Sequence, residues 1–271
     1  MKKRPPARAE LLAQIRQKPA VFAVWTILRL IVMGIGIRSI FNKQWESVLT
    51  CLLTLTLFLA PSFVEKQLHI KLPTVLEVTV IVFIFCAEVL GEIACFYIKY
   101  PLWDTMLHTV NGFLFAAFGF CLVDLLNENK KIKFELSPQF MALVAFCFSM
   151  TIGVIWEFFE FSMDHLFALD MQKDMLLTGF QSVYLDPAQS NTPLVLEDIT
   201  RTVIETADGK QTVLAGYLDI GIADTMKDLF VNFIGAAVFS VFGMLYVRHR
   251  GKNRIAAAFI PVVETEVHAS E

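Results

Sequence analysis

The chain has 271 residues, 56% of them hydrophobic, and its mean hydropathy of +0.58 is too high for an ordinary soluble domain. The formal net charge is −3, and the basic residues form short clusters at segment ends, which excludes the broad basic patch of a nucleic-acid-binding protein. The composition predicts an all-α, polytopic membrane protein with six transmembrane helices.

The amino-terminal residues 1–20 are expected to be cytoplasmic, with a short amphipathic helix over residues 8–18 that Pro19 ends. The first span is predicted from Val21 to Ile37. It contains Arg29 and lacks a clear small-residue cleavage site, so we interpret it as an uncleaved span and not as a secretory signal.

The second span is predicted from Trp45 to Val64, so that residues 21–64 hold spans one and two. Pro61 falls near the end of this span, where a proline does least harm to a helix. Residues 73–166 are predicted to hold three further spans, over Pro73–Tyr97, Asp104–Leu126 and Phe140–Leu166.

Residues 167–219 are predicted to form an extracytoplasmic loop with a β-hairpin. Two runs rich in β-branched residues flank Asp208-Gly209, and this dipeptide favours a type I′ turn with positive φ at both positions. The sixth span follows over residues 220–247, and residues 248–271 form the tail.

The distribution of basic residues predicts the orientation of the helices. With six spans, the amino terminus, the loops at 65–72 and 127–138, and the tail share one side, and they hold fifteen Lys and Arg against six on the other side. Because Lys and Arg accumulate on the cytoplasmic side, both termini are expected there.

The five cysteines all lie in apolar runs, and none belongs to a Cys-x-x-Cys motif. This pattern indicates neither a disulfide framework nor a zinc knuckle, and favours buried packing thiols. The residues are Cys51, Cys86, Cys95, Cys121 and Cys147.

A polar motif on an apolar helix occurs twice, over residues 104–120 and 224–243. Each copy opens with Asp-Thr-Met and carries a second polar side chain four residues later, His108 in the first copy and Asp228 in the second. Helical periodicity places each pair on one face. The repeat predicts two parallel helix pairs, spans three and four and spans five and six, related by an axis along the membrane normal.

The predicted topology brings most intramembrane acidic residues to the outer part of the bundle. A charge near the bilayer centre is costly, so these groups are expected to face one another, water or a cation. Carboxylates with an imidazole suit Mg²⁺, Mn²⁺, Zn²⁺ or iron. The candidate metal ligands are Asp104, His108, Glu157, Glu160, Asp224 and Asp228, and the candidate polar-core residues are Glu88, Glu92, Asn111 and Asn232.

A purely structural interpretation of these groups stays open. Glu160, Asp164, His165 and Asp219 are also expected of helix ends that face water, and the deeper residues are also expected of a hydrogen-bonded polar core. The small residues of the repeat indicate close helix approach and not ligand binding. These residues are Gly112, Gly119, Gly235, Ala236 and Ala237.

Three ordered motifs, WDTMLHTVNGFLFA, IWEFFEF and GYLDIGIADTMKDLFVNFIGA, resemble the YjdF-like bacterial inner-membrane proteins over spans three to six. More distantly, the spacing of Asp104 and His108, then Glu157, then Asp228, Asn232 and Gly235 resembles the VanZ-like proteins, some of which are associated with glycopeptide resistance. The resemblance implies a location in the bacterial cytoplasmic membrane, and neither family implies a particular reaction.

Three functions are compatible with these features. The first is an outward-facing, divalent-metal-dependent site that acts on a lipid-linked or envelope substrate, with membrane lipid as a partner and no nucleic acid. The second is a proton- or cation-coupled transporter, although no motif indicates a helix broken near the midplane. The third is a non-catalytic structural or resistance protein of the membrane.

Overall fold

The computed structural model describes residues 18–68, 70–127, 136–249, 258–260 and 262–263. Within this part of the chain, six helices are long and apolar enough to cross a membrane, and they confirm the predicted polytopic all-α fold. Their bounds are Pro19–Phe41, Trp45–Leu68, Thr74–Ile93, Trp103–Asp124, Pro138–Phe167 and Ile222–Arg248. Most residues of three predicted segments lie outside the described residues: the amphipathic helix at 8–18, the loop at 127–138 and the tail at 248–271.

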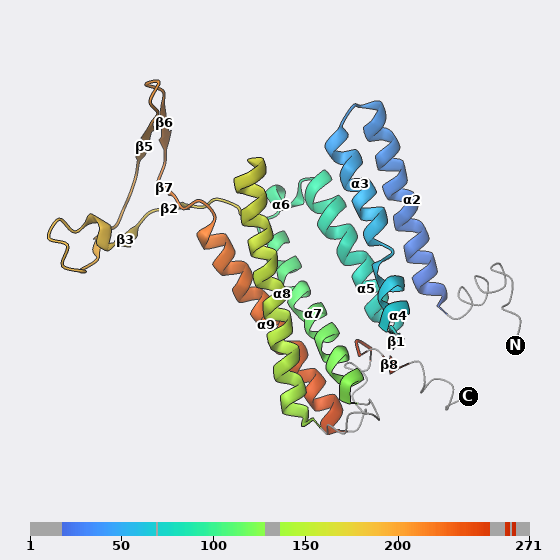
Figure 1. The fold of residues 1–271 in the computed structure, drawn as a ribbon. Helices are drawn as coiled ribbons and strands as arrows, with labels where there is room; N and C mark the ends of the chain where they lie inside the picture. The colour runs from blue at the N-terminus through green and yellow to red at the C-terminus, as the bar shows by residue number, and fades with distance from the viewer. Residues whose placement is uncertain (1–17, 69, 128–135, 250–257, 261, 264–271) are drawn as a thin grey trace, which may run out of the picture. The chain divides into compact units, whose positions relative to one another are not determined.

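The chain divides into two compact units. The first comprises the residues up to Gly153 together with those from Phe230 onward, and the second comprises Val154–Leu229. In the first unit, helix α2 (Pro19–Phe41) packs against α3 (Trp45–Leu57) and α5 (Thr74–Phe85), as Figure 1 shows. Apolar side chains on these three helices form one buried cluster, which includes Val32, Phe58 and Ile81.

Pro61 interrupts the second span, which corrects the prediction that it lies harmlessly near the end. Helix α3 ends at Leu57, and α4 (Ala60–Leu68) begins after a short break. A proline lacks the N–H that would bond to the carbonyl four residues earlier, and its ring collides with that carbonyl. Pro61 is therefore accommodated in the first turn of a new helix, where its missing N–H costs little.

The helix of the third span ends at Ile93 and its second half is irregular, whereas the sequence predicted one helix over Pro73–Tyr97. After α5 the backbone continues as a π-helix, η1 (Cys86–Ile93), and Ala94 N donates to Val89 O at 2.9 Å. Cys95 then adopts a left-handed conformation with φ of 59°, and a short helix, α6 (Phe96–Lys99), follows. Such π-helical turns are rare and occur frequently at functional sites.

One end of the first unit is tied together by contacts between distant segments. Strand β1 (Ile70–Lys71) pairs antiparallel with β8 (Val262–Val263). Lys18 Nζ, directly before α2, donates to Glu65 Oε1 at 3.0 Å and to Glu77 Oε2 at 2.6 Å. The start of α2, the loop after α4 and the chain after α9 therefore lie at the same end of this unit.

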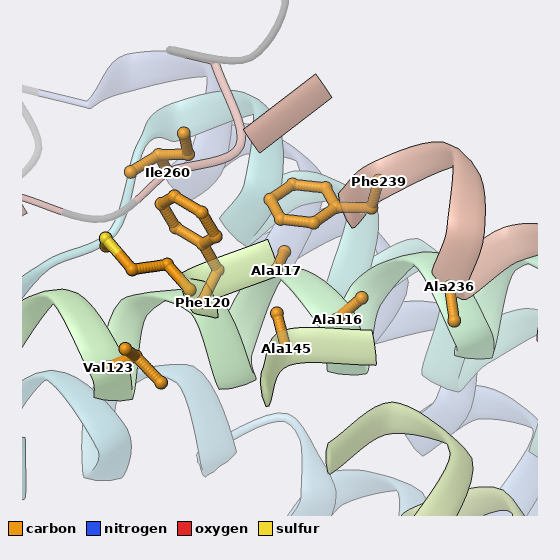
Figure 2. Close-up of a cluster of buried hydrophobic side chains, with 9 residues drawn as sticks. Ala116, Ala117, Phe120, Val123, Ala145, Ala236, Phe239 and Ile260 are labelled. Carbon is orange, nitrogen blue, oxygen red and sulfur yellow. The ribbon is translucent and has the colours of Figure 1, made fainter. Parts of the chain in front are cut away.

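A second buried cluster joins α7 (Trp103–Asn127) to the first-unit parts of α8 (Pro138–Phe167) and α9 (Ile222–Arg248). Figure 2 shows the small side chains of Ala116, Ala117 and Ala145 beside the rings of Phe120 and Phe239. Alanines allow the helix backbones to approach, and the rings fill the space that remains.

The two copies of the sequence repeat meet where their glycines lie. A Cβ at Gly112 would overlap the carbonyl oxygen of Asn232, and a Cβ at Gly235 would overlap the carbonyl oxygen of Thr109. These glycines allow close approach of α7 and α9, as the sequence predicted. Farther along both helices, Phe120 contacts Phe239 and Gly243, so α7 and α9 run parallel.

The second unit contains the predicted insertion, built from three antiparallel strand pairs. Strands β2 (Leu176–Leu177) and β7 (Tyr217–Leu218) close its base, and β3 (Phe180–Ser182) pairs with β4 (Leu194–Leu196). Strands β5 (Thr202–Glu205) and β6 (Gln211–Leu214) form the hairpin predicted around Asp208-Gly209 (Figure 1). A single-turn 3₁₀ helix, η2 (Val183–Leu185), follows β3.

The hairpin turn differs from the predicted type I′ turn. Gly209 has φ of 82°, but Asp208 is not among the residues with positive φ. Gly209 N donates to Thr206 O at 2.8 Å, and Thr206 N donates to Lys210 O at 3.0 Å. These bonds define a longer loop in which one left-handed residue follows the turn, so only the glycine is conformationally required.

All five cysteines are free thiols, in agreement with the absence of a predicted disulfide framework. Cys51 and Cys121 are buried, as expected of packing residues. Cys95 and Cys147 are exposed, so the prediction that all five are buried is wrong for these two. Cys95 is exposed because the π-helix ends there, and Cys147 because it lies on an outer face of α8.

Candidate functional site

In the first unit, one turn of α7 presents the only histidine among the candidate residues. His108 is buried, with 8% of its surface exposed, and its Nε2 lies 3.5 Å from Oδ1 of Asp104. The predicted i, i+4 spacing therefore produces a direct contact. A carboxylate beside an imidazole orients the ring.

Asn232 of α9 is buried within the first unit, near Asn111 of α7. It is 1% exposed, and its Oδ1 accepts from Asn111 Nδ2 at 3.5 Å. Ser149 Oγ donates to the carbonyl of Gly112 at 2.7 Å. A Cβ at Gly153 would lie only 2.8 Å from Asn232 Nδ2, so small residues of α7 and α8 surround the amide. The structure thus places the side chains of Asn111 and Asn232 within hydrogen-bonding distance of each other.

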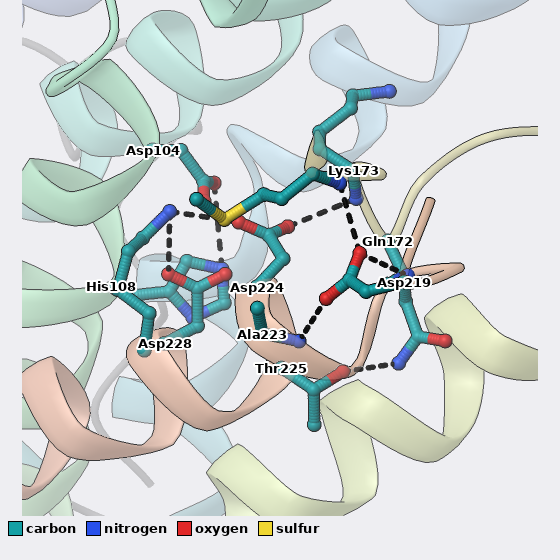
Figure 3. A network of polar contacts seen from close by, with 12 residues as sticks. Asp104, His108, Gln172, Lys173, Asp219, Ala223, Asp224, Thr225 and Asp228 are labelled. Carbon is teal, nitrogen blue, oxygen red and sulfur yellow. Dashed lines mark hydrogen bonds and ion pairs between the residues drawn. The ribbon is translucent and has the colours of Figure 1, made fainter. Parts of the chain in front are cut away.

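In the second unit, three aspartates bind the backbone of the segment that follows α8 (Figure 3 shows two of them). Asp164 accepts from the N–H groups of Met171 and Gln172 at 2.6 and 2.9 Å. Asp224 accepts from Lys173 N at 2.9 Å, and Asp219 accepts from Met175 N at 2.9 Å. The carboxylates satisfy backbone donors that no strand partner satisfies. We call residues 171–175 the strap.

Asp219 is buried at the start of α9 and accepts additional backbone bonds. Ala223 N donates to it at 2.7 Å and Gly221 N at 3.3 Å. Burial alone would raise the pKa of Asp219, but the backbone donors of Met175, Ala223 and Gly221 outweigh burial and hold its pKa below the ordinary value. Asp219 is therefore a helix-capping carboxylate, and not merely the water-facing end of a span.

Both oxygens of Asp224 already have positively charged or polar donors. Lys173 N donates to its Oδ2, and Lys227 Nζ donates to its Oδ1 at 2.7 Å. The same ammonium lies 3.8 Å from Oδ1 of Asp228. Asp228 is only 1% exposed, so Lys227 compensates part of the charge of two buried carboxylates.

Glu157 and Glu160 lie on α8, 4% and 8% exposed. Gln172 Nε2 donates to Glu157 Oε2 at 3.4 Å and to Thr225 Oγ1 at 2.6 Å, so the strap contacts α8 and α9. Trp156, which the sequence indicated only as a packing residue, donates from its indole nitrogen to Glu160 Oε1 at 2.8 Å. Glu160 is thus a buried group and not a water-facing helix end.

Glu88 and Glu92, the other candidate polar-core residues, lie on η1 in the first unit. Glu88 is half-buried and Glu92 is exposed. Because its side chain is exposed, Glu92 does not lie in a buried polar core.

Several polar residues of these networks carry no signal in the sequence. Gln172, Lys173 and Thr225 lie in or next to loops, and their roles depend on partners about fifty residues away. The cluster of Lys18, Glu65 and Glu77 was also missed, although a glutamate near the start of an apolar span is a signal of a required counter-charge.

Buried carboxylates, one imidazole and asparagine side chains inside long apolar helices define a polytopic membrane protein with a polar interior. Residues 20–249 match the family described as "Predicted membrane protein (DUF2238)", and the chain belongs to this family. An "Uncharacterized protein" of Thermotoga maritima is 28% identical over 107 residues, which cover 40% of this chain and 53% of that relative. The chain therefore matches about half the length of this relative. No solved structure matches.

Proposed function

We propose that the chain is a protein of the bacterial cytoplasmic membrane whose carboxylate and histidine residues form an outward-facing, divalent-metal-dependent site. This site acts on a lipid-linked or envelope substrate. Within its family we propose that it is YjdF-like, on the three ordered motifs of spans three to six. The VanZ-like resemblance finds no support in the matches, and the proposal does not depend on it.

The observation that carries the proposal is the contact of Gly112 with the backbone of Asn232. His108 precedes Gly112 by one helical turn, and Asp228 precedes Asn232 by one turn, in two parallel helices. His108 and Asp228 occupy equivalent positions in the sequence repeat, each four residues after the Asp of an Asp-Thr-Met motif, and the topology predicted from the sequence favours a similar depth for them.

We propose His108, Asp228, Glu157 and Glu160 as the ligand set, with Asp104 orienting the imidazole. All four proposed ligands are buried, and oxygen donors with one nitrogen suit Mg²⁺, Mn²⁺, Zn²⁺ or iron. Asp224 is left out of the set, because Lys173 and Lys227 already engage its two oxygens. A bound ion would activate water or polarise a phosphoryl oxygen of the substrate.

A proton- or cation-coupled transporter is the second candidate, and one observation favours it. The second span is interrupted before Pro61, although no sequence motif indicated a broken helix, and the third span contains the π-helix η1. Interrupted spans form ion and substrate sites in transporters. In that function the buried carboxylates would titrate during passage.

Metal analysis of the protein purified in detergent, together with melting temperatures with and without EDTA, tests the metal site. We expect wild type to lose stability on chelation and Asp228→Asn to be less stable and insensitive to EDTA. A ligand at a hundredfold excess over Kd contributes about 2.7 kcal/mol to the folded state. Asp170→Asn, at an exposed carboxylate, is the matched control and should behave as wild type.

A structural polar core predicts the opposite result. Asp228→Asn would then keep its hydrogen bonding while losing a costly buried charge, so it would be as stable as wild type or more stable. A wild type that contains no metal and does not respond to EDTA, with a stable Asn variant, contradicts the metal proposal.

A further inference from the structure

A cavity of about 440 Å³ opens between α2, α3 and η1, entirely within the first unit. Its walls are mostly apolar, with Ile31 and Ile35 from α2 and Phe85 and Leu90 from the third span. Its polar lining includes Arg38, near the end of α2, and Gln44, directly before α3. The cavity is therefore amphiphilic, with apolar walls and a cationic group at one end.

The apolar and cationic parts are separated along the helix axis. Ile31 precedes Arg38 by seven residues, or roughly 10 Å at 1.5 Å per residue. A ligand that fits this cavity carries an anionic group at one end and an apolar portion about as long as this wall.

The cationic end lies at the level of the membrane interface. Trp45 directly follows Gln44 and is 62% exposed, and tryptophan is enriched where spans meet the headgroup layer. Lys99 adds a second cation, because its Nζ donates at 2.7 Å to the carbonyl of Ala94, which lines the cavity. Glu46 and Glu92 are exposed and do not line it.

We propose that this cavity binds one molecule of anionic phospholipid, with the phosphate at Arg38 and one acyl chain along Ile31, Ile35 and Leu90. An arginine guanidinium forms paired, charge-assisted hydrogen bonds with phosphate, which favours a phosphate over an uncharged headgroup. A free phosphate would leave the apolar walls without contacts, so the acyl chain contributes to the binding. This lipid site is independent of the proposed metal site.

Native mass spectrometry of the full chain in detergent, titrated with phosphatidylglycerol or with diacylglycerol of the same acyl chains, which lacks the phosphate, tests the proposal. We expect one molecule of phosphatidylglycerol to bind more tightly than diacylglycerol. Arg38→Gln should weaken phosphatidylglycerol binding about tenfold and leave diacylglycerol binding unchanged. Leu90→Trp should weaken both lipids, because the indole fills the apolar part of the cavity.

Lys43→Gln is the matched control, since Lys43 is an exposed cation like Arg38 but does not line the cavity. It should change phosphatidylglycerol binding by less than about twofold, because a charge outside the cavity forms no direct hydrogen bond with the phosphate. The melting temperature of each variant shows whether it is folded. If Leu90→Trp does not fold, the Arg38→Gln result alone decides the test. Equal binding of the two lipids, or equal losses in the Arg38 and Lys43 variants, overturns the proposal. Displacement of the lipid by soluble glycerol phosphate also overturns it.

Discussion

The aspartates of the second unit show that acidic residues in a membrane protein serve different purposes. Asp164, Asp219 and Asp224 accept hydrogen bonds from successive backbone N–H groups of the strap. A buried N–H without a partner costs free energy comparable to a lost hydrogen bond, so these carboxylates stabilise an irregular segment. Part of the acidic excess of the sequence is therefore structural, which narrows the candidate metal ligands.

Asp219 leads to a prediction about pH. Its pKa is depressed in the folded protein, so its stabilising contribution is present above the unfolded pKa of about 3.9 and is lost as pH falls through the folded pKa. Asp219→Asn should lower the free energy of unfolding by about 1–3 kcal/mol at pH 7, because charge-assisted backbone bonds become neutral ones. The melting-temperature difference from wild type should shrink as pH falls below 4.

Asp198→Asn provides the control, since Asp198 is an exposed carboxylate of the same insertion. Its melting temperature should follow that of wild type at every pH. A pH-independent difference between wild type and Asp219→Asn would show that the carboxylate contributes through its shape and not through its charge.

At the scale of the helices, glycine positions decide how closely α7 and α9 approach. We expect Gly235→Ala to destabilise the protein by about 1–3 kcal/mol, the usual cost of inserting an atom into a packed site. The new Cβ would overlap Thr109 O and lie 2.9 Å from Phe113 N, and both are backbone atoms that move only with the helix. Thermal unfolding in detergent measures the effect.

Gly34→Ala is the matched variant, because a Cβ at Gly34 of α2 has no neighbouring atom within 4 Å. Alanine is the better helix former by about 1 kcal/mol, so this variant should be as stable as wild type or more stable. If both alanine variants gain stability, the close contact between α7 and α9 is wrong.

At the scale of the whole chain, the orientation in the membrane is a proposal that follows from the fifteen-to-six division of Lys and Arg. The pairing of β1 with β8 supports the grouping of the loop after α4 with the tail on one side.

Cysteine labelling in intact cells tests the orientation, in a variant whose five native cysteines are replaced. A cysteine at Asn191, in the insertion, should react with a membrane-impermeant maleimide. A cysteine at Lys66, in α4, should react only after the membrane is opened. Labelling of Lys66 in sealed cells would contradict the orientation and the outward-facing site proposed from it.

The number of spans, the insertion hairpin and the close packing of the repeat followed from the sequence alone. Apolar runs of about twenty residues, a glycine in a turn and small residues on helix faces express local requirements of the backbone and the bilayer. Residues adjacent in the chain determine such features, so a sequence pattern is sufficient to predict them.

The tertiary structure decided which polar groups meet. Lys173 N and Asp224 are 51 residues apart, and Lys18 and Glu77 are 59 residues apart, so neither bond has a local pattern. The π-helix after Phe85 likewise had no recognised sequence pattern, whereas the break before Pro61 has a local cause in the proline itself. A buried carboxylate binds the donors that the fold brings within 3 Å, and for Asp224 these include a backbone N–H of the strap as well as the ammonium of Lys227.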